Sequence, residues 1–281
     1  MRQERDVVTS PQNKYVSLAR GLTNKKNREK ERLFRFDGIK LLCEAVKKSV
    51  DISFILVREG EWSTLLEKAE RLYGITENNI DCDVITVAGG VFDRLSEEMA
   101  PEGVICVANY MENVREITDE GDCLSACEDE RILLLESVRD PLNVGAVMRV
   151  AAAFGVDKVI MSRDCADVYN SKTLRASMGT LFNISVDRVS NLPLAVSSLR
   201  KQGRRVFAAA LDRDSERLGE MAIKRGDCVI IGNEGHGLTK ETVEACDGTV
   251  FIPMAEGVES LNAATAAAVL VWEFFGKGGA L

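Results

Sequence analysis

Chemically active side chains gather at three places where strand-like apolar runs of the sequence end. Each place combines polar residues that could bind a phosphate, orient a hydroxyl group or help to move a proton. The candidates are Asn143 and Arg149 after the first run, Glu234 after the second, and Ser260 and Asn262 after the third. Because open α/β sheets bind ligands at the carboxyl ends of their strands, we expect the three loops to form one site.

The second loop, residues 231–238, holds three glycines around Glu234 and His236. Glycine has no Cβ, so main-chain N–H and C=O groups can approach a ligand closely there. The loop lacks the G-x-x-x-x-G-K-[ST] pattern of phosphate-binding loops and the G-x-G-x-x-G order of dinucleotide folds. Glu234 fits a base or an orienting acceptor, and it also fits a solvent-exposed loop acid. His236, the only histidine, has a suitable side chain for a general base, but we interpret it as incidental.

Three other candidates also have a purely structural interpretation. Arg149 fits a surface arginine that pairs with an acid. Ser260 fits a helix cap, and Asn262 fits a first-turn residue that donates to a neighbouring loop. These alternatives explain the single residues, but they do not explain three unusual strand ends in one chain.

Alternating helical and strand-like patterns predict two α/β domains. The first spans residues 14–109, after an extension over 1–13, and an acidic linker follows over 110–130. Its strands are expected at residues 52–57, 84–87 and 104–107, and its helices in the basic segment and at 62–73 and 91–98. The second domain spans 131–281, with strands at 132–136, 158–161, 206–210, 228–231 and 249–252 and helices at 143–154, 171–180, 192–202 and 261–275. This order predicts a parallel sheet covered by helices on both faces.

The net charge of −8 counts against a nucleic-acid partner, but the distribution of charge favours one. Residues 14–48 hold eleven Lys and Arg against four Asp and Glu, a net +7, so the rest of the chain carries −15. A concentrated basic segment suits phosphate contact, although a solvated helix face has the same composition. Phe34 and Phe36 within it could stack on bases, but we interpret them as anchors to the domain.

Several classes of protein are excluded by composition. No apolar run approaches the length of a membrane span, and residues 1–30 are too charged for a signal peptide, so a soluble cytoplasmic protein is expected. The eight cysteines form no C-x-x-C pair and are predicted to be reduced core thiols. With one histidine and one close cysteine pair, Cys123 and Cys127, no zinc site is expected.

Taken together, the three loops resemble the SpoU or TrmH branch of the SPOUT methyltransferase superfamily. The motifs that match are Asn143-x-Gly145-x-x-x-Arg149, then Gly232-Asn-Glu234-Gly-His-Gly237-Leu238, then Ile252-Pro-Met254 leading into Ser260-Leu261-Asn262-Ala263. Residues 14–108 resemble, more loosely, the small α/β substrate-binding domain that often precedes this catalytic domain.

The resemblance implies a parallel sheet with a C-terminal trefoil knot, a homodimer and bound S-adenosylmethionine. The residues implied in cofactor binding are Gly232, Ile252, Leu261, Met254 and Gly237. The reaction implied is methyl transfer to a ribose 2'-hydroxyl of RNA, with ribosomal RNA as the expected substrate and no metal. RNA would be contacted by the front domain, through Lys25, Lys26, Arg28, Arg32 and Arg35.

Arg149 is expected to be the central catalytic residue. A guanidinium stays protonated and is a poor base, so Arg149 would bind the phosphate beside the target ribose. Glu234 would orient Arg149 or a substrate group, and Asn143, Ser260 and Asn262 would position the nucleotide. Two alternatives stay open: a transfer RNA 2'-O-methyltransferase, and a non-catalytic RNA-binding factor in ribosome assembly. A nucleotide-binding enzyme acting on small molecules is disfavoured by the missing phosphate-loop patterns.

Overall fold

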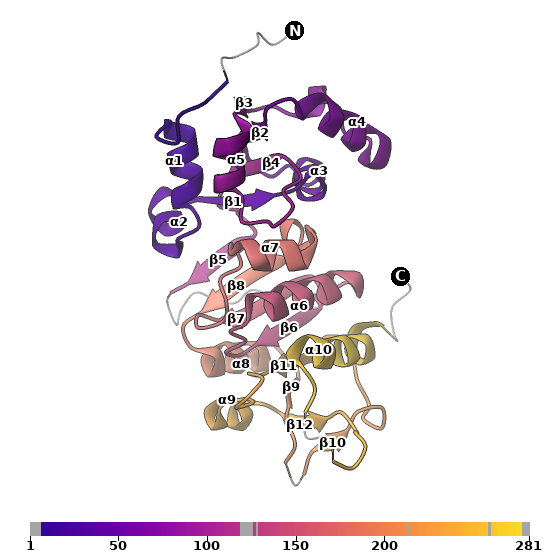
Figure 1. Ribbon diagram of the computed structural model, residues 1–281. Helices are drawn as coiled ribbons and strands as arrows, with labels where there is room; N and C mark the ends of the chain where they lie inside the picture. Colours follow the sequence, from indigo (N-terminus) through magenta and orange to yellow (C-terminus); the bar gives the residue numbers. More distant parts are fainter. Residues whose placement is uncertain (1–6, 119–125, 128, 213, 258–259, 277–281) are drawn as a thin grey trace. The chain divides into compact units, whose positions relative to one another are not determined.

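The structure is a computed structural model that describes residues 7–118, 126–127, 129–212, 214–257 and 260–276 (Figure 1). It divides into two compact units. Unit 1 comprises Met1–Met111 together with Tyr169–Phe182, and unit 2 comprises Glu112–Val168 and Asn183–Leu281. The chain therefore leaves unit 2 once to supply a short segment to unit 1.

Unit 1 is built on a four-stranded sheet in the order β1-β4-β2-β3. β2 and β3 are parallel, and β4 is antiparallel to both of its neighbours. The elements are α1 (Lys14–Gly21), α2 (Lys25–Glu31), β1 (Leu33–Asp37), α3 (Ile39–Lys47), β2 (Ile52–Arg58), α4 (Trp62–Tyr73), η1 (Glu77–Asn79), β3 (Asp83–Val87), α5 (Gly89–Leu95), β4 (Val104–Asn109), α7 (Ser171–Ser177) and η2 (Thr180–Phe182).

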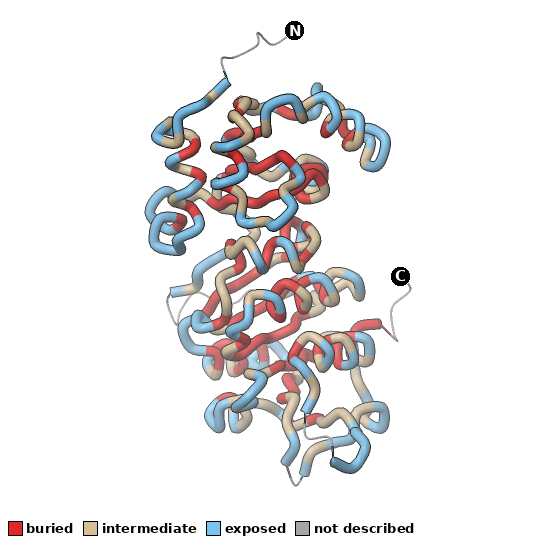
Figure 2. Tube along the Cα trace, in the orientation of Figure 1, coloured by how far each residue is buried: buried red, intermediate tan, exposed pale blue. Residues whose placement is uncertain are grey.

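The expected basic helix is in fact two helices followed by a strand. Asn24 begins α2 by accepting a hydrogen bond from the Lys26 amide, and Arg32 ends it in the left-handed conformation. β1 follows at once and is largely buried (Figure 2). Phe34 and Phe36 on this strand are both buried. Their rings pack against Tyr169 and Phe182 of the supplied segment, at centroid distances of 4.8 and 5.4 Å. The anchoring interpretation of the two phenylalanines is thereby confirmed.

Arg35 points to the opposite face of β1, into a core formed with α1 and α5. It makes two 2.9 Å hydrogen bonds to Asp37, and it also donates to the Ala19 and Leu95 carbonyls. Arg28 is buried as well, and it donates to carbonyls of the turn between α1 and α2. The assignment of Arg28 and Arg35 to RNA contact is corrected here, because buried guanidinium groups that bind their own chain do not reach a phosphate.

Unit 2 is built on an eight-stranded sheet in the order β10-β12-β9-β11-β6-β7-β8-β5. All of its strand pairs are parallel, as the sequence predicts. The elements are β5 (Val114–Ile117), β6 (Ile132–Leu135), α6 (Pro141–Ala153), β7 (Lys158–Ser162), β8 (Ser185–Val189), α8 (Leu192–Lys201), β9 (Val206–Ala209), β10 (Glu216–Arg217), β11 (Cys228–Ile231), α9 (Lys240–Ala245), β12 (Gly248–Phe251), α10 (Ala263–Val271) and a π-helical turn (Trp272–Gly276).

Helices cover both faces of this sheet. On one face α8 packs on a layer of buried side chains from the central strands, which includes Ile132, Leu134, Ile160 and Ile230. On the other face α10 packs against α6 and β11 (Figure 1). The order β12-β9-β11-β6 brings the carboxyl ends of the three candidate strands to one region of the sheet.

The first candidate loop is shorter than the sequence predicts. α6 begins at Pro141, two residues earlier than expected, because the Asp140 side chain caps it and proline suits its first turn. Asn143 therefore lies inside the first turn of the helix, at its buried side.

Four elements of unit 2 were not anticipated: β5, β8, β10 and α9. β5 lies inside the expected linker 110–130, of which residues 119–125 and 128 fall outside the described part. It is held to β8 by ion pairs, Arg115 with the buried Asp187 at 2.8 Å and Glu116 with Arg188 at 2.6 Å.

The helix expected at residues 171–180 is shorter and belongs elsewhere. It ends at Ser177, because Met178 takes the left-handed conformation. This helix, α7, groups with unit 1, although the chain on either side of it belongs to unit 2.

Seven of the eight cysteines lie in the described residues, and all seven are free thiols. Burial raises the pKa of Cys43 and Cys228 to about 11 and that of Cys246 to about 12, which keeps these thiols protonated. Cys127 differs, because it is exposed, and Cys123 lies outside the described residues. No helix in the described ranges is long and apolar enough to cross a membrane.

We predict that Arg35→Met lowers the free energy of unfolding of unit 1 by about 3 to 5 kcal/mol, because it leaves the buried Asp37 carboxylate without its partner. The units hold one tryptophan each, Trp62 and Trp272, so Trp62 fluorescence in a Trp272→Phe background reports on unit 1 during urea unfolding. Lys68→Met is the control, because its ion pair with Glu102 is half exposed and should contribute less than about 1 kcal/mol. Equal losses from the two substitutions would contradict the prediction.

Candidate active site

The glycine-rich loop after β11 is closed by its own backbone. Asn233 and Gly237 exchange two main-chain hydrogen bonds of 2.9 Å. A Cβ at Gly232 would lie 2.5 Å from the Gly237 carbonyl carbon, and Gly237 has a φ of +68°. Both glycines are therefore required by the shape of the loop itself, whatever ligand its main chain contacts.

Residues that directly follow β6 hold this loop at both ends. Near its start, the Asn233 side chain donates to the Ser137 carbonyl at 2.8 Å. Near its end, the buried Glu136 carboxylate accepts from the Thr239 amide and hydroxyl, each at 2.8 Å, and from the Thr242 hydroxyl. The position of Glu234 between these two attachments is thus set from β6.

The Asn143 side chain connects the three candidate loops. This residue is 8% exposed, and its Nδ2 donates to Glu234 Oε1 at 2.5 Å. Its Oδ1 accepts from Asn262 Nδ2 at 3.0 Å. The Asn262 Oδ1 in turn accepts from the Ala264 and Thr265 amides and caps α10. We call Glu234, Asn143 and Asn262 the amide bridge.

Two candidates lie outside the amide bridge. Arg149 is exposed on α6, and within the described ranges it has no hydrogen bond or ion pair. Glu234 accepts from Asn143 and has no hydrogen bond or ion pair with Arg149, so of its two expected roles only the orienting of a substrate group stays a prediction. Ser260 is exposed and does not cap α10, since Asn262 does. His236 is exposed too, and its ring nitrogen lies 3.4 Å from the Asn233 side-chain oxygen.

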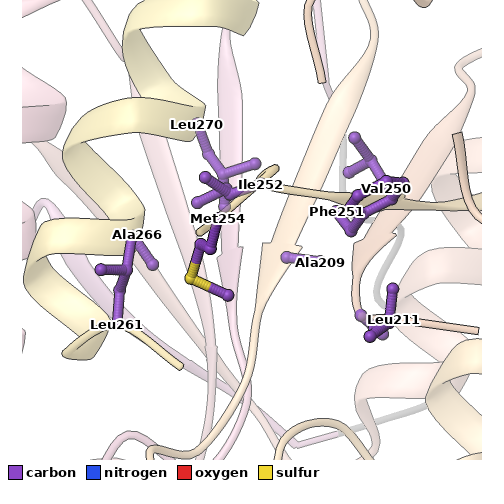
Figure 3. A pocket seen from close by; sticks show the side chains of 10 residues that line it. Ala209, Leu211, Val250, Phe251, Ile252, Met254, Leu261, Ala266 and Leu270 are labelled. Carbon is purple, nitrogen blue, oxygen red and sulfur yellow. The ribbon is translucent and has the colours of Figure 1, made fainter. Parts of the chain in front are cut away.

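An apolar pocket of about 180 Å³ opens between the loops after β9 and β12 and the start of α10 (Figure 3). Three of the expected cofactor residues line it, namely Ile252, Met254 and Leu261, whereas Gly232 and Gly237 do not. The Met254 sulfur is the one heteroatom among the side chains drawn. The lining residues not anticipated from the sequence include Ala209, Ala210, Leu211 and Ala266.

The lining residues that the sequence did not predict have no polar side-chain group, so their residue types did not indicate a binding site. Their position does indicate one, because Ala209–Leu211 follow β9, which lies between β11 and β12 in the sheet. The carboxyl end of such a strand belongs to the same ligand-binding edge as its neighbours.

A polar cluster supports the loop after β6. Partial burial opposes ionisation of Asp164, but hydrogen bonds from Ser137, Ser162 and Arg139 outweigh it and lower the Asp164 pKa. Ser137 has a φ of +54° and presents its carbonyl to Asn233. The cluster thereby fixes the backbone to which the glycine-rich loop is attached. No group of His, Cys, Asp and Glu side chains that could hold a metal occurs in the described residues.

Comparison with known proteins identifies the family of both units. The family model described as the SpoU rRNA Methylase family matches residues 130–272, and that of an MRM3-like substrate binding domain matches residues 13–106. The chain is 30% identical over 269 residues to 23S rRNA (guanosine(2553)-2'-O)-methyltransferase RlmP of Bacillus subtilis, a match that covers 96% of this chain and 99% of that protein. It is 29% identical over 240 residues to 23S rRNA (guanosine-2'-O-)-methyltransferase RlmB of Xanthomonas campestris, covering 84% and 93%.

A solved structure agrees with these relatives. The AdoMet-bound rRNA methyltransferase from Sinorhizobium meliloti is 27% identical, with a TM-score of 0.77 and 95% of each chain covered. The first family model spans about half of the chain and includes every residue of the amide bridge. The chain belongs to the SpoU rRNA methylase family.

Proposed function

We propose that this protein transfers a methyl group from S-adenosylmethionine to a ribose 2'-hydroxyl of ribosomal RNA. The observation that carries the proposal is the amide bridge, which joins the three family motifs and ends one residue from Leu261 in the apolar pocket. The names of the relatives support ribosomal RNA rather than transfer RNA as the substrate.

The apolar pocket fits S-adenosylmethionine, which supplies an electrophilic methyl group on a sulfonium when bound. Apolar side chains can enclose an adenine ring, while main-chain groups of the glycine-rich loop match its polar edges. The lining contains no Lys or Arg that would repel the sulfonium charge. Gly232 and Gly237, which do not line the pocket, would then bind the cofactor through their main-chain groups beside it.

We assign Asn143 and Asn262 a different part from the one first expected. Their amide groups bind within the chain, so they align Glu234 rather than hold the nucleotide directly. Glu234 keeps its second carboxylate oxygen to accept a hydrogen bond from the ribose hydroxyl or a group beside it. Arg149 would bind the adjacent phosphate with its fork of donors, and Ser260 would contact the nucleotide.

Unit 1 would bind the RNA through exposed cations, namely Lys25, Lys26 and Arg32. We further propose that residues 14–109, completed by Tyr169–Phe182, form this RNA-binding domain, and that the rest of 131–281, together with β5, forms the methyltransferase domain. Work on ribosomal RNA would place the protein in the cytoplasm. These assignments rest on the matched family models and on the charge of the segment 14–48.

We also propose a homodimer and a knotted C-terminal segment. Exposed apolar side chains on α6, on α10 and directly after it, Leu142, Val269 and Trp272, support a subunit interface along these two helices. The chain passes from β12, beyond β9 in the sheet, back to α10, which packs on α6. This return path is consistent with the trefoil knot that the family resemblance implies.

Arg149→Ala should abolish methyl transfer while leaving the affinity for S-adenosylmethionine within about twofold, because Arg149 does not line the pocket. The measurement is tritium transfer to ribosomal RNA that lacks the modification, with calorimetry for the cofactor. Arg149→Lys should recover only a small part of the activity, since lysine lacks the planar fork. If native protein methylates only transfer RNA, or nothing, the proposed function is wrong.

Asn143→Asp should give an enzyme whose activity increases as the pH falls. The substitution sets two carboxylates within hydrogen-bond distance, and such a pair keeps one shared proton until the pH rises well above the pKa of a lone carboxyl. We expect kcat to fall about 10- to 100-fold at about pH 8 and to recover partly near about pH 5.5. The matched variant Asn143→Ala should be impaired at every pH. A pH profile parallel to that of the native enzyme would contradict the amide bridge.

Ala266→Leu should weaken S-adenosylmethionine binding at least about tenfold, because the larger side chain fills part of the pocket. Calorimetric titration measures the change, and circular dichroism checks the fold. Thr265→Leu is the control, since it adds an apolar side chain at the preceding, exposed position of α10. Unchanged affinity in Ala266→Leu would show that the cofactor binds elsewhere.

A further inference from the structure

A column of stacked side chains in unit 1 runs from the surface into the core. The Arg32 guanidinium lies 4.5 Å from the centre of the Tyr110 ring. Tyr110 stacks on Tyr169 with ring centres 4.0 Å apart and an interplanar angle of 19°. Tyr169 packs against Phe34 at 4.8 Å. Arg32 is exposed, whereas Tyr169 and Phe34 are buried, so the column has one accessible end.

Hydrogen bonds hold this column in place. The Tyr110 amide donates to the Arg32 carbonyl at 2.9 Å, which ties the second layer to the backbone of the first. The Met111 amide donates to the Tyr169 hydroxyl at 2.9 Å and fixes the third layer. The packed rings and these hydrogen bonds restrict the position of the exposed guanidinium. Less conformational entropy of the Arg32 side chain would therefore be lost when a ligand binds.

The backbone of Arg32 is in a conformation that favours glycine. It ends α2 with φ 55° and ψ 33°, in the left-handed region. Glycine or asparagine is common at such a position, and another residue there raises the energy of the folded chain. An arginine at this place is best explained by its side chain, since residues held in sparsely populated backbone regions cluster at functional sites.

Among the described residues, no acid forms an ion pair with Arg32. Lys25 and Lys30 on the same helix have ion pairs with Glu29 and Glu31, whereas no carboxylate in the described ranges lies within 4.0 Å of the Arg32 guanidinium. The guanidinium lies over the Tyr110 ring, and Arg32 as a residue is exposed to solvent. An exposed planar cation can stack on an aromatic ring and can also attract a negatively charged group beside that ring.

We infer that Arg32, supported by Tyr110, is a stacking platform for an unpaired base of the RNA. Single-stranded RNA is recognised by stacking bases on aromatic rings and arginine planes, and its phosphates attract the same cation. The inference rests on the proposed function, because it takes RNA as the partner of unit 1. It adds a specific contact for Arg32, stacking on a base, and a requirement for a single-stranded nucleotide.

The test measures binding of the full chain to two labelled RNA probes by fluorescence anisotropy. One is an oligoadenylate of about 12 nucleotides, a length within the usual site size for single strands, and the other is the same ribose-phosphate chain without bases. Arg32→Lys keeps the charge but removes the plane, so we expect about fivefold weaker binding to oligoadenylate and no change with the abasic probe. Lys26→Ala is the control, because it removes only charge and should weaken both probes equally.

Arg32→Gly separates binding from stability. Glycine relieves the left-handed backbone, so the unfolding midpoint followed by Trp62 should not fall, while the preference for oligoadenylate over the abasic probe should disappear. A lower midpoint with the preference intact would show that the column only stabilises unit 1, and it would overturn the inference. So would native protein that binds both probes equally. Methyl transfer by the native chain is measured separately, so failure here is distinguishable from failure of the proposed function.

Discussion

The organisation of the site depends on one buried amide, the side chain of Asn143. An amide can donate and accept at the same time, so it can join a carboxylate to a second amide, as it does between Glu234 and Asn262. Neither a carboxylate, which only accepts, nor an ammonium group, which only donates, could do both. Three loops that lie far apart in the sequence are held together by this property, and each loop arrives from a different strand or helix of unit 2.

The glycine-rich loop, which its own backbone closes, is attached to the sheet through residues that follow β6. Glu136 and Ser137, at the end of that central strand, receive the bonds that fix the loop on both sides. The polar cluster around Asp164 then steadies Ser137. The Glu234 carboxylate, which lies on an exposed turn, is in this way positioned from a fully buried strand of the sheet.

Periodicity and loop chemistry predicted the parallel sheet and the approach of the three loops, because buried apolar strands and polar strand ends are local signals. The sequence did not reveal β5, whose residues Val114–Ile117 are short and half exposed. It also assigned Arg35 to the surface by its charge, although Asp37, two residues along the same strand face, neutralises it in the core. Pairings of this kind depend on tertiary contacts with α1 and α5, which composition does not encode. The apolar pocket residues 209–211 escaped notice for the opposite reason, because nothing in their type marks them.

The segment Tyr169–Phe182 belongs to unit 1 although the chain on either side of it belongs to unit 2. Its rings cover Phe34 and Phe36, so the front unit has no complete core without it. The two units are consequently not interchangeable modules. If recombination exchanged only the first hundred or so residues between relatives, the side chains of the new front unit would not fit those of the old segment Tyr169–Phe182. Substitutions in the front unit and in this segment are therefore constrained to occur together.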